Sequence, residues 1–367
     1  MALNEDTSAD LGLLAGPIDE ETALFDRMSE NVIGAWRLPL GVLTGIVING
    51  REHRIAMATE EPSVIAAVNR TAVLFNAVGG IQAEADEPVT RAQIMFRVEE
   101  ESVPWVREEI LCRKDRYIGI ANQSNPGLTG AGGGAFDIET ETPGEGFVVV
   151  RLLVRTMDAM GANAVNTMAE ALQQAFVLEY GDVPGYERGM AILTNEGSGR
   201  LARARIELPF EMLPGEDGAA FGHRMEMASE FALRSPERAV THNKGIMNGV
   251  IAAALPLGQD TRAMSASFFD AACRQGRHLP MSRWFTQDDR LIGILEMPVV
   301  AGYVGGFRHH PGVEAAFVFD GIRSYRELCH VICSVGLAQN FGALRALMTE
   351  GIQAGHMSLH ARKFRQS

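Results

Sequence analysis

Lys244 stands in a run of polar and small residues, Thr241-His-Asn-Lys-Gly-Ile-Met-Asn-Gly249, just ahead of an apolar helical stretch. A partly buried lysine at this place would supply a fixed positive charge where a carbonyl oxygen becomes an oxyanion. The composition fits a lysine in a surface loop equally well. Both interpretations of Lys244 stay open on these residues alone.

Two glutamates, Glu60 and Glu61, precede Pro62-Ser63 at the expected entry of a helix. Acidic residues favour helix N-termini, so the pair could do no more than offset the helix dipole. A buried glutamate beside Lys244 would instead act as a proton donor. The sequence allows both roles.

Small residues follow Asp158 in the run Asp158-Ala-Met-Gly-Ala-Asn163. We expect Asp158 to be the N-cap of a helix whose first-turn amides stay open. Such a helix start attracts anions through its free N–H groups and its dipole. Spacing alone favours the plainer alternative, an ordinary capped helix with small residues for packing.

The glycine run Gly130-Ala-Gly-Gly-Gly-Ala135 satisfies the letter of a dinucleotide fingerprint, G-x-G-x-x-[GA]. That fingerprint needs a strand before it and a helix after it. Here a polar loop over 122–129 precedes the run and an extended segment follows it. We therefore interpret it as a turn and not as a Rossmann motif.

His356 and His360 stand four residues apart near the end of the chain and would share one helix face. Met357 occupies the position of the glutamate of H-E-x-x-H, and no third ligand suggests itself, so no metal site is expected. A single histidine titrating near neutrality suits protonation of a leaving group. Two structural histidines are the plain alternative.

The elements that must position these groups fall into two classes. A helix is expected over 18–36, a hairpin over 41–48 and 54–58 around Asn49-Gly50, and a helix over 64–78. After residue 200 come a strand over 201–208 and helices over 217–234, 244–255, 260–275 and 325–350. This part of the chain is predicted to be a helical main body.

Between these parts the order of elements is β-α-β-β-α-β, the split βαβ pattern of ferredoxin-like modules. The expected segments are 92–99, 103–121, 136–142, 146–156, 158–180 and 191–194. The predicted fold class is therefore α+β, with a helical main domain (1–89 and 195–350) and an inserted ferredoxin-like domain (90–194).

Composition excludes several classes of protein. The 367 residues are 46% hydrophobic and 22% charged, as in a folded protein of about two domains. With 33 basic and 46 acidic residues the net charge is −13, and no basic run is long enough to bind nucleic acid. We see neither a secretory signal nor a membrane-spanning segment, and the four cysteines show no disulfide spacing, so we expect a cytoplasmic protein.

Taken together, the motifs resemble the bacterial, soluble class II 3-hydroxy-3-methylglutaryl-coenzyme A reductases, over about residues 28–362. The matching segments are Glu30–Gly34, Glu60–Ser63, Asp158–Asn163, Arg200–Arg205, Thr241–Gly249, Gly336–Asn340 and Gly351–His356. The resemblance implies four-electron interconversion of the acyl-coenzyme A and mevalonate plus coenzyme A, using two nicotinamide cofactors.

The resemblance also implies roles for single residues. Lys244 would stabilise the oxygen that gains charge, and Glu61 would supply protons to it. Asp260 would tune that pair, and His356 would protonate the departing thiolate. The implied substrate contacts are Ser63, Arg238 and Asn248, and the implied cofactor contacts are Asn125, Asp158, Gly161 and Asn163.

The resemblance further implies a non-Rossmann nucleotide domain and an obligate homodimer with active sites at the subunit interface. Two departures from the family pattern stand out. Residues 351–367 form only a remnant of a C-terminal flap, which leaves closure over the site reduced. Asn125 stands where the NAD-using members have an aspartate. This difference weakens the expected preference for NAD over NADP and leaves NAD slightly ahead. A second hypothesis is a non-catalytic or weakly active acyl-coenzyme A or nucleotide binder that lost turnover with the flap.

Overall fold

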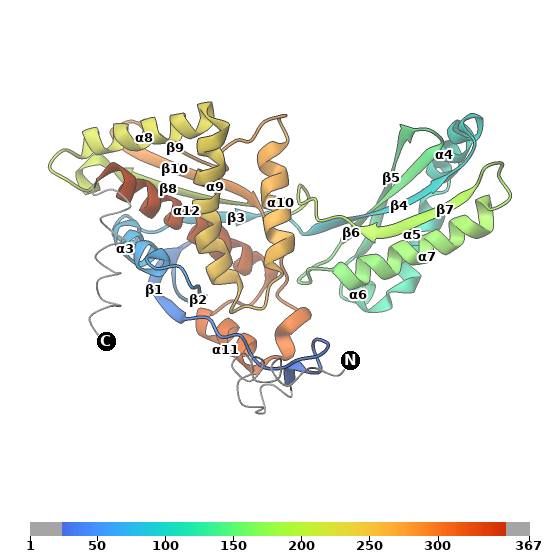
Figure 1. Cartoon of the computed structure of the whole chain (residues 1–367), viewed down its shortest axis with the longest axis horizontal. Helices are drawn as coiled ribbons and strands as arrows, with labels where there is room; N and C mark the ends of the chain where they lie inside the picture. Colours follow the sequence, from blue (N-terminus) through green and yellow to red (C-terminus); the bar gives the residue numbers. More distant parts are fainter. Residues whose placement is uncertain (1–23, 350–367) are drawn as a thin grey trace, which may run out of the picture.

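The computed structural model describes residues 24–349, which form two lobes joined at a narrow waist (Figure 1). Each lobe has its own cluster of buried hydrophobic side chains, and the cluster of the smaller lobe comes from residues 92–180. The chain crosses the waist twice. The two crossings run side by side, because the N–H of Asp86 donates to the carbonyl of Leu201 and that of Val89 to Gly199.

The main body begins with the predicted hairpin. Strands β1 (Leu40–Ile48) and β2 (Arg51–Ala58) pair antiparallel. Asn49 and Gly50 have φ values of 50° and 78°, the left-handed conformations that a type I′ turn requires. The prediction from the Asn-Gly dipeptide is confirmed.

The helix expected over 18–36 is wrong in its described part. Only residues 24 and 25 are helical, and residues 26–39 form turns and irregular chain. Asn31 adopts a φ of 54°, and a left-handed residue interrupts a right-handed helix.

A four-stranded antiparallel sheet corrects the expectation of a main body that is helical apart from one hairpin and one strand, so this lobe is mixed helix and sheet. Its order is β3-β8-β10-β9, and only β8 was predicted. The strands are β3 (Gln82–Ala85), β8 (Leu201–Pro209), β9 (Ser282–Gln287) and β10 (Arg290–Pro298).

Helices pack around this sheet and the hairpin. They are α3 (Val64–Ala77), α8 (Gly218–Arg234), α9 (Pro236–Ala254), α10 (Thr261–Cys273), α11 (Pro311–Asp320) and α12 (Tyr325–Met348), with 3-10 turns η2 (Phe210–Met212) and η3 (Gly306–His309). Helix α12 lies at the centre, against α3, α9 and the sheet, and residues 331–342 are all buried. It is long and apolar enough to cross a membrane, but 72% of its most apolar window is buried, as in the core helix of a globular fold.

The smaller lobe has the predicted order of strands and helices. Its elements are β4 (Val89–Arg97), η1 (Glu100–Ser102), α4 (Val103–Cys112), α5 (Lys114–Ser124), α6 (Pro126–Gly130), β5 (Gly134–Gly144), β6 (Phe147–Arg155), α7 (Ala162–Tyr180) and β7 (Glu187–Leu193). The strands form an antiparallel sheet in the order β5-β6-β4-β7. Helices α4, α5 and α7 pack on this sheet (Figure 1).

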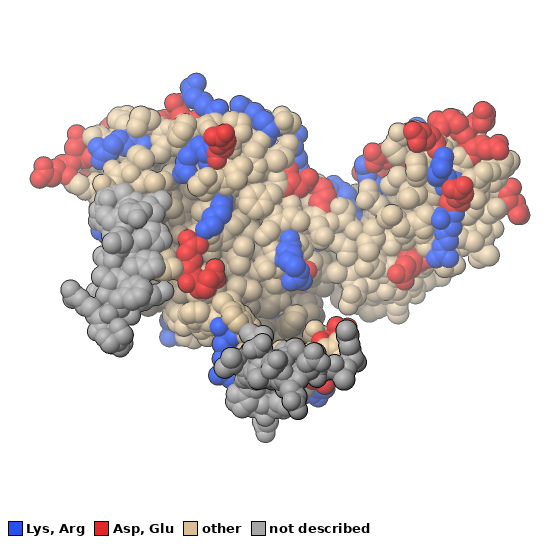
Figure 2. Space-filling view, viewed as in Figure 1, with Lys and Arg blue, Asp and Glu red and all other residues tan. Residues whose placement is uncertain are grey.

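Two local predictions for this lobe need correction. The single helix expected over 103–121 is divided into α4 and α5, because Arg113 between them has a non-helical conformation (φ −106°, ψ 20°). The loop expected over 122–129 contains the short helix α6, while the glycines after it form the predicted turn into β5. On the face drawn in Figure 2, basic and acidic side chains are interspersed, and acidic ones gather at the far end of this lobe.

Candidate active site

Lys244 lies in the middle of α9 and not in a loop before it. Ser235 caps this helix, since its hydroxyl accepts the N–H of Arg238 at 3.3 Å. Side chains four residues apart share a helix face, so Lys244 and Asn248 project to the same side, and Arg238, in the first turn of α9, lines the same cavity. That side faces α3 and α12.

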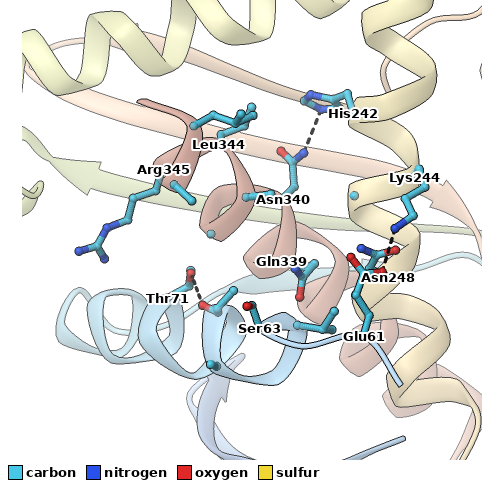
Figure 3. Close-up of a pocket in the computed structure, with 18 of the residues that line it drawn as sticks. Glu61, Ser63, Thr71, His242, Lys244, Asn248, Gln339, Asn340, Leu344 and Arg345 are labelled. Carbon is cyan, nitrogen blue, oxygen red and sulfur yellow. Dashed lines mark hydrogen bonds and ion pairs between the residues drawn. The ribbon is translucent and has the colours of Figure 1, made fainter. Parts of the chain in front are cut away.

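A cavity of about 470 Å³ lies between α3, α9 and α12 (Figure 3). This volume suits a small organic group. The side chains used in the argument below are Glu61, Ser63, Arg238, His242, Lys244, Asn248, Gln339 and Asn340, all of which line it.

Lys244 and Glu61 form an ion pair in this cavity, with 2.9 Å between Nζ and Oε2 (Figure 3). The side chains of Lys244 and Glu61 are 58% and 35% exposed, so this ion pair is not buried. An exposed pair stabilises a fold by only about 0–1 kcal/mol. Both groups are therefore accessible to a ligand at little cost to stability.

Three polar atoms of cavity-wall residues are buried without any hydrogen-bond partner among residues 24–349. They are the hydroxyl of Ser63, Nδ1 of His242 and Oε1 of Gln339. Ser63 stands before α3 as expected, but its φ is 76° and its side chain makes no cap bond. A left-handed serine and three unpartnered buried groups cost free energy, which a polar ligand in the cavity would recover in part.

Arg238 is half-buried beside these groups. Burial lowers the pKa of its guanidinium, which stays protonated at neutral pH. Within the described residues it forms no ion pair, so its donors are available to a carboxylate.

His242 is buried on the far side of the cavity and belongs to a polar network. Its Nε2 lies 2.6 Å from Oγ of Ser282 and 3.1 Å from Nδ2 of Asn340, whose Oδ1 accepts the indole N–H of Trp284 at 2.7 Å. Burial, with a smaller effect from the charge of Arg238, lowers the pKa of His242 to about 3. This imidazole is neutral near pH 7 and holds the wall in place.

Asp260, another of the expected catalytic groups, is not part of the Lys244–Glu61 contact. Asp260 caps α10, where its Oδ1 accepts the N–H groups of Arg262 and Ala263 at 3.0 Å each. It is not among the described residues that line the cavity. His356 and His360 lie outside the described residues.

Asp158 is not the N-cap of α7, contrary to expectation. Its Oδ1 accepts the N–H of Tyr325 at 2.7 Å, at the start of α12, and its carbonyl accepts the N–H of Tyr303. Gly161 occupies the N-cap of α7 with a φ of 93°, and Asn163 lies in the first turn. The carboxylate is used by another helix, so the first turn of α7 has no side-chain cap.

The chain before α7 fits a phosphate-bearing cofactor. An uncapped start of a 19-residue helix offers free N–H groups and the positive end of the dipole. Gly302 lies directly against this segment, since a Cβ there would be 2.3 Å from the backbone N of Met160. Asn125 is placed elsewhere in the lobe as the N-cap of α6, where Oδ1 accepts the N–H of Leu128 at 3.1 Å.

Comparison with known proteins decides what these features belong to. A family sequence model described as hydroxymethylglutaryl-coenzyme A reductase matches residues 2–361. The chain belongs to this family. The 3-hydroxy-3-methylglutaryl-coenzyme A reductase of Archaeoglobus fulgidus is 39% identical over 342 residues, which cover 92% of this chain and 76% of the relative.

Two further matches agree. A probable reductase of this name from Borreliella burgdorferi is 36% identical over 94% of this chain and 78% of its own length. The class II reductase of Streptococcus pneumoniae, solved with NADPH in open conformations, superposes with a TM-score of 0.85 at 34% identity, covering 95% and 94% of the two chains. The resemblance to class II hydroxymethylglutaryl-coenzyme A reductases is confirmed, and the chain is an NAD(P)H-dependent oxidoreductase. The non-catalytic alternative is not favoured.

Sequence reasoning missed part of the cavity wall of this reductase. It noted the segment 336–340 as family-like without giving Gln339 or Asn340 a role, and it did not single out His242. The available signal was a Gln-Asn pair inside the apolar helix α12, because polar groups buried in such a helix need a reason.

Proposed function

We propose that the cavity between α3, α9 and α12 binds the 3-hydroxy-3-methylglutaryl group, with its thioester carbonyl at Lys244 and Glu61. The observation that carries this proposal is the Lys244–Glu61 contact of 2.9 Å inside the cavity that Arg238 also lines. A cation and a carboxyl group side by side can stabilise a developing oxyanion and then protonate it.

The reaction takes two hydrides, one from each of two NAD(P)H molecules. The first adds to the thioester carbon and gives a hemithioacetal. Its C–S bond breaks, which releases coenzyme A and leaves mevaldehyde, and the second hydride reduces this aldehyde to mevalonate. Each step places negative charge on the same oxygen, so one fixed cation serves both.

The residues of this chain hold and protonate the reacting group. Lys244 stabilises the oxygen, and Glu61 returns a proton to it. Arg238 clamps the distal carboxylate, and the unpartnered hydroxyl of Ser63 hydrogen-bonds to the substrate. Asn248 stands one helical turn beyond Lys244 on the same cavity wall and completes the set of substrate contacts.

Two further roles rest on the resemblance alone. His356 protonates the departing thiolate of coenzyme A, and Asp260 tunes the charge of the Lys244–Glu61 pair. In the structure Asp260 caps the start of α10.

The cofactor diphosphate lies at the start of α7, near Asp158, Gly161 and Asn163. Support comes from the uncapped helix start and from Gly302 against Met160. We assign Asn125 to the ribose, where a neutral amide neither repels a 2′-phosphate nor excludes NAD. The cofactor is NAD or NADP, with NAD slightly favoured.

We assign residues 90–194 to a ferredoxin-like, non-Rossmann nucleotide-binding domain, and residues 1–89 and 195–350 to the main domain. The antiparallel order β5-β6-β4-β7 supports this assignment, because it is the order in which a split βαβ unit arranges its strands. Four free cysteines support a cytoplasmic location.

The working unit is a homodimer with interfacial active sites. Support comes from large apolar side chains exposed along the chain leading into β1 and on α3, namely Trp36 at 86%, Leu40 at 68% and Val73 at 73%. A second copy of the chain would cover side chains of this kind.

Steady-state assays in both directions test the proposal. Purified protein should oxidise NADH or NADPH with the acyl-coenzyme A, and should reduce NAD or NADP with mevalonate and coenzyme A. Absence of all four activities in folded protein would contradict it. The ratio of the two directions shows whether synthesis or degradation of mevalonate is favoured.

A further inference from the structure

We propose that Arg200 is a positioning residue for the cofactor, because its buried guanidinium fixes the segment 158–161 ahead of α7. This inference rests on the proposed cofactor site at that segment. Arg200 lies at the waist, directly before β8, and is only 2% exposed.

The guanidinium binds the segment through two consecutive backbone carbonyls. Nη1 donates to the carbonyl of Met160 at 2.6 Å, and Nη2 donates to that of Ala159 at 3.1 Å. The remaining contacts anchor the same group to three other parts of the fold: the carbonyl of Ala301 at 2.9 Å, Oγ1 of Thr90 at 3.1 Å and the hydroxyl of Tyr325 at 3.4 Å. One side chain thereby ties the segment to both lobes.

This contact sets the direction of the backbone. The C=O and N–H of a trans peptide point in opposite directions. Because the carbonyl of Met160 points at Arg200, the N–H of Gly161 points away from it. The left-handed φ of Gly161, 93°, then starts α7. Arg200 therefore fixes which backbone donors are presented at this helix start.

The charge of Arg200 is also unusual. Within residues 24–349 it forms no ion pair, and the nearby carboxylate of Asp158 is engaged by the N–H of Tyr325. Buried cations are normally paired with an acidic group. The positive charge of Arg200 is held by carbonyl groups on one side of the segment 158–161 and is not neutralised by a carboxylate. It therefore favours an anion, such as a cofactor diphosphate, on the other side of the segment.

The test compares Arg200→Lys and Arg200→Met with wild type. The readouts are KM for NAD(P)H, KM for the acyl-coenzyme A, kcat, and the Kd for NADPH measured by fluorescence without acyl substrate. Loss of two fork contacts should raise the cofactor KM and Kd by about tenfold or more, while the acyl-coenzyme A KM stays within about twofold. A purely structural defect would raise the KM values for NAD(P)H and for the acyl-coenzyme A alike.

Arg203→Lys is the matched control, three residues further along the chain in β8. Arg203 is half-buried and pairs with Asp86 and Glu296, so this variant should keep the cofactor KM of wild type. Thr90→Val is a second, milder variant, because it removes one acceptor of Arg200 and the long hydrogen bond from Oγ1 of Thr90 to the carbonyl of Met160 (3.4 Å), and leaves the cation in place. It should raise the cofactor KM by about threefold.

An unchanged cofactor KM and Kd in Arg200→Lys, or equal increases for both substrates, would overturn the inference. If the Arg200 variants do not fold, the same criteria applied to Thr90→Val decide it. If wild type transfers no hydride, the proposed function fails, and the NADPH Kd of the variants still tests Arg200 separately.

Discussion

At the scale of single residues, burial changes the protonation of two side chains of the main body in opposite directions. Asp320 at the end of α11 is 1% exposed, its Oδ1 accepts the N–H of Ala56 at 2.9 Å, and its Oδ2 has no described partner. Burial raises the pKa of Asp320 to about 7 against the smaller effect of that hydrogen bond. For His242, burial lowers the pKa to about 3.

These two groups make opposite contributions to stability across the acid range. The pKa of Asp320 is higher in the folded state than the ordinary 3.8. Its contribution to the free energy of unfolding is therefore complete below pH 3.8 and is lost as the pH rises to about 7. The pKa of His242 is lower than the ordinary 6.5, so its contribution is complete above that pH and is lost as the pH falls towards 3.

Replacing Asp320 isolates one of these contributions. Asp320→Asn keeps an acceptor for Ala56 and cannot ionise, so its free energy of unfolding should gain about 2–4 kcal/mol relative to wild type between pH 4.5 and 8. Urea unfolding at several pH values measures this. Parallel pH profiles of the two proteins would show that Asp320 does not titrate in this range.

His356 is expected to act only where a thiolate leaves. His356→Gln should lower kcat with the acyl-coenzyme A by about 10²-fold or more, and should lower reduction of free mevaldehyde far less. His360→Gln, at a histidine with no assigned role, is the control. Equal losses on both substrates would remove His356 from this step.

At the scale of elements, the sequence predicted the turns and helices that depend on neighbouring residues alone. Asn49-Gly50 gave the β1–β2 hairpin because both residues tolerate a left-handed φ. The β9–β10 hairpin was missed because Asp288 and Asp289 make its turn, with φ values of 48° and 56°, from a pair that signals a turn less strongly. Helix α9 was expected to begin at Lys244 because the residues before its apolar part are polar.

Contacts between distant residues left no local signal. Asp158 looked like the cap of the helix that follows it, yet its carboxylate binds Tyr325, 167 positions further along the chain. Glu61 and Lys244 are 183 positions apart, and only the family resemblance put them in one site. The roles of Gln339 and Arg200 depend on packing around α12 and the waist, which no short pattern encodes.

Helix α6 gives a test of cofactor choice. Asn125 caps it, and aspartate is an equally good N-cap, so Asn125→Asp should leave the helix intact while adding a negative charge. The added charge repels a 2′-phosphate and should shift the ratio of kcat/KM values towards NAD by about tenfold. Asn125→Ser is the neutral capping control. An unchanged ratio would mean that residue 125 does not face the 2′ position.

At the scale of the whole molecule, the exposed apolar side chains of Leu40 and Val73 lie on β1 and α3, which pack against each other, and Trp36 lies on the chain before β1. Helix α3 follows Ser63 directly, and several of its residues line the cavity. A second copy seated on α3 would therefore contact an element of the cavity wall. This placement connects assembly with activity.

A charge on α3 tests that connection. Val73→Glu should shift the protein from dimer to monomer in sedimentation velocity and lower kcat in parallel, because a buried unpaired carboxylate opposes association. Leu178→Glu is the matched control, since Leu178 is 87% exposed on α7, in the other lobe. A monomeric wild type, or a fully active monomeric variant, would contradict interfacial active sites.

The most direct test of the central claim is the stoichiometry of a single reaction. Cofactor oxidation and free coenzyme A thiol are followed together while the protein consumes the 3-hydroxy-3-methylglutaryl thioester, in wild type and in Lys244→Met. The account predicts two NAD(P)H oxidised for each thiol released, and loss of both signals in the variant. A ratio of one to one, or an active Lys244→Met enzyme, would contradict it.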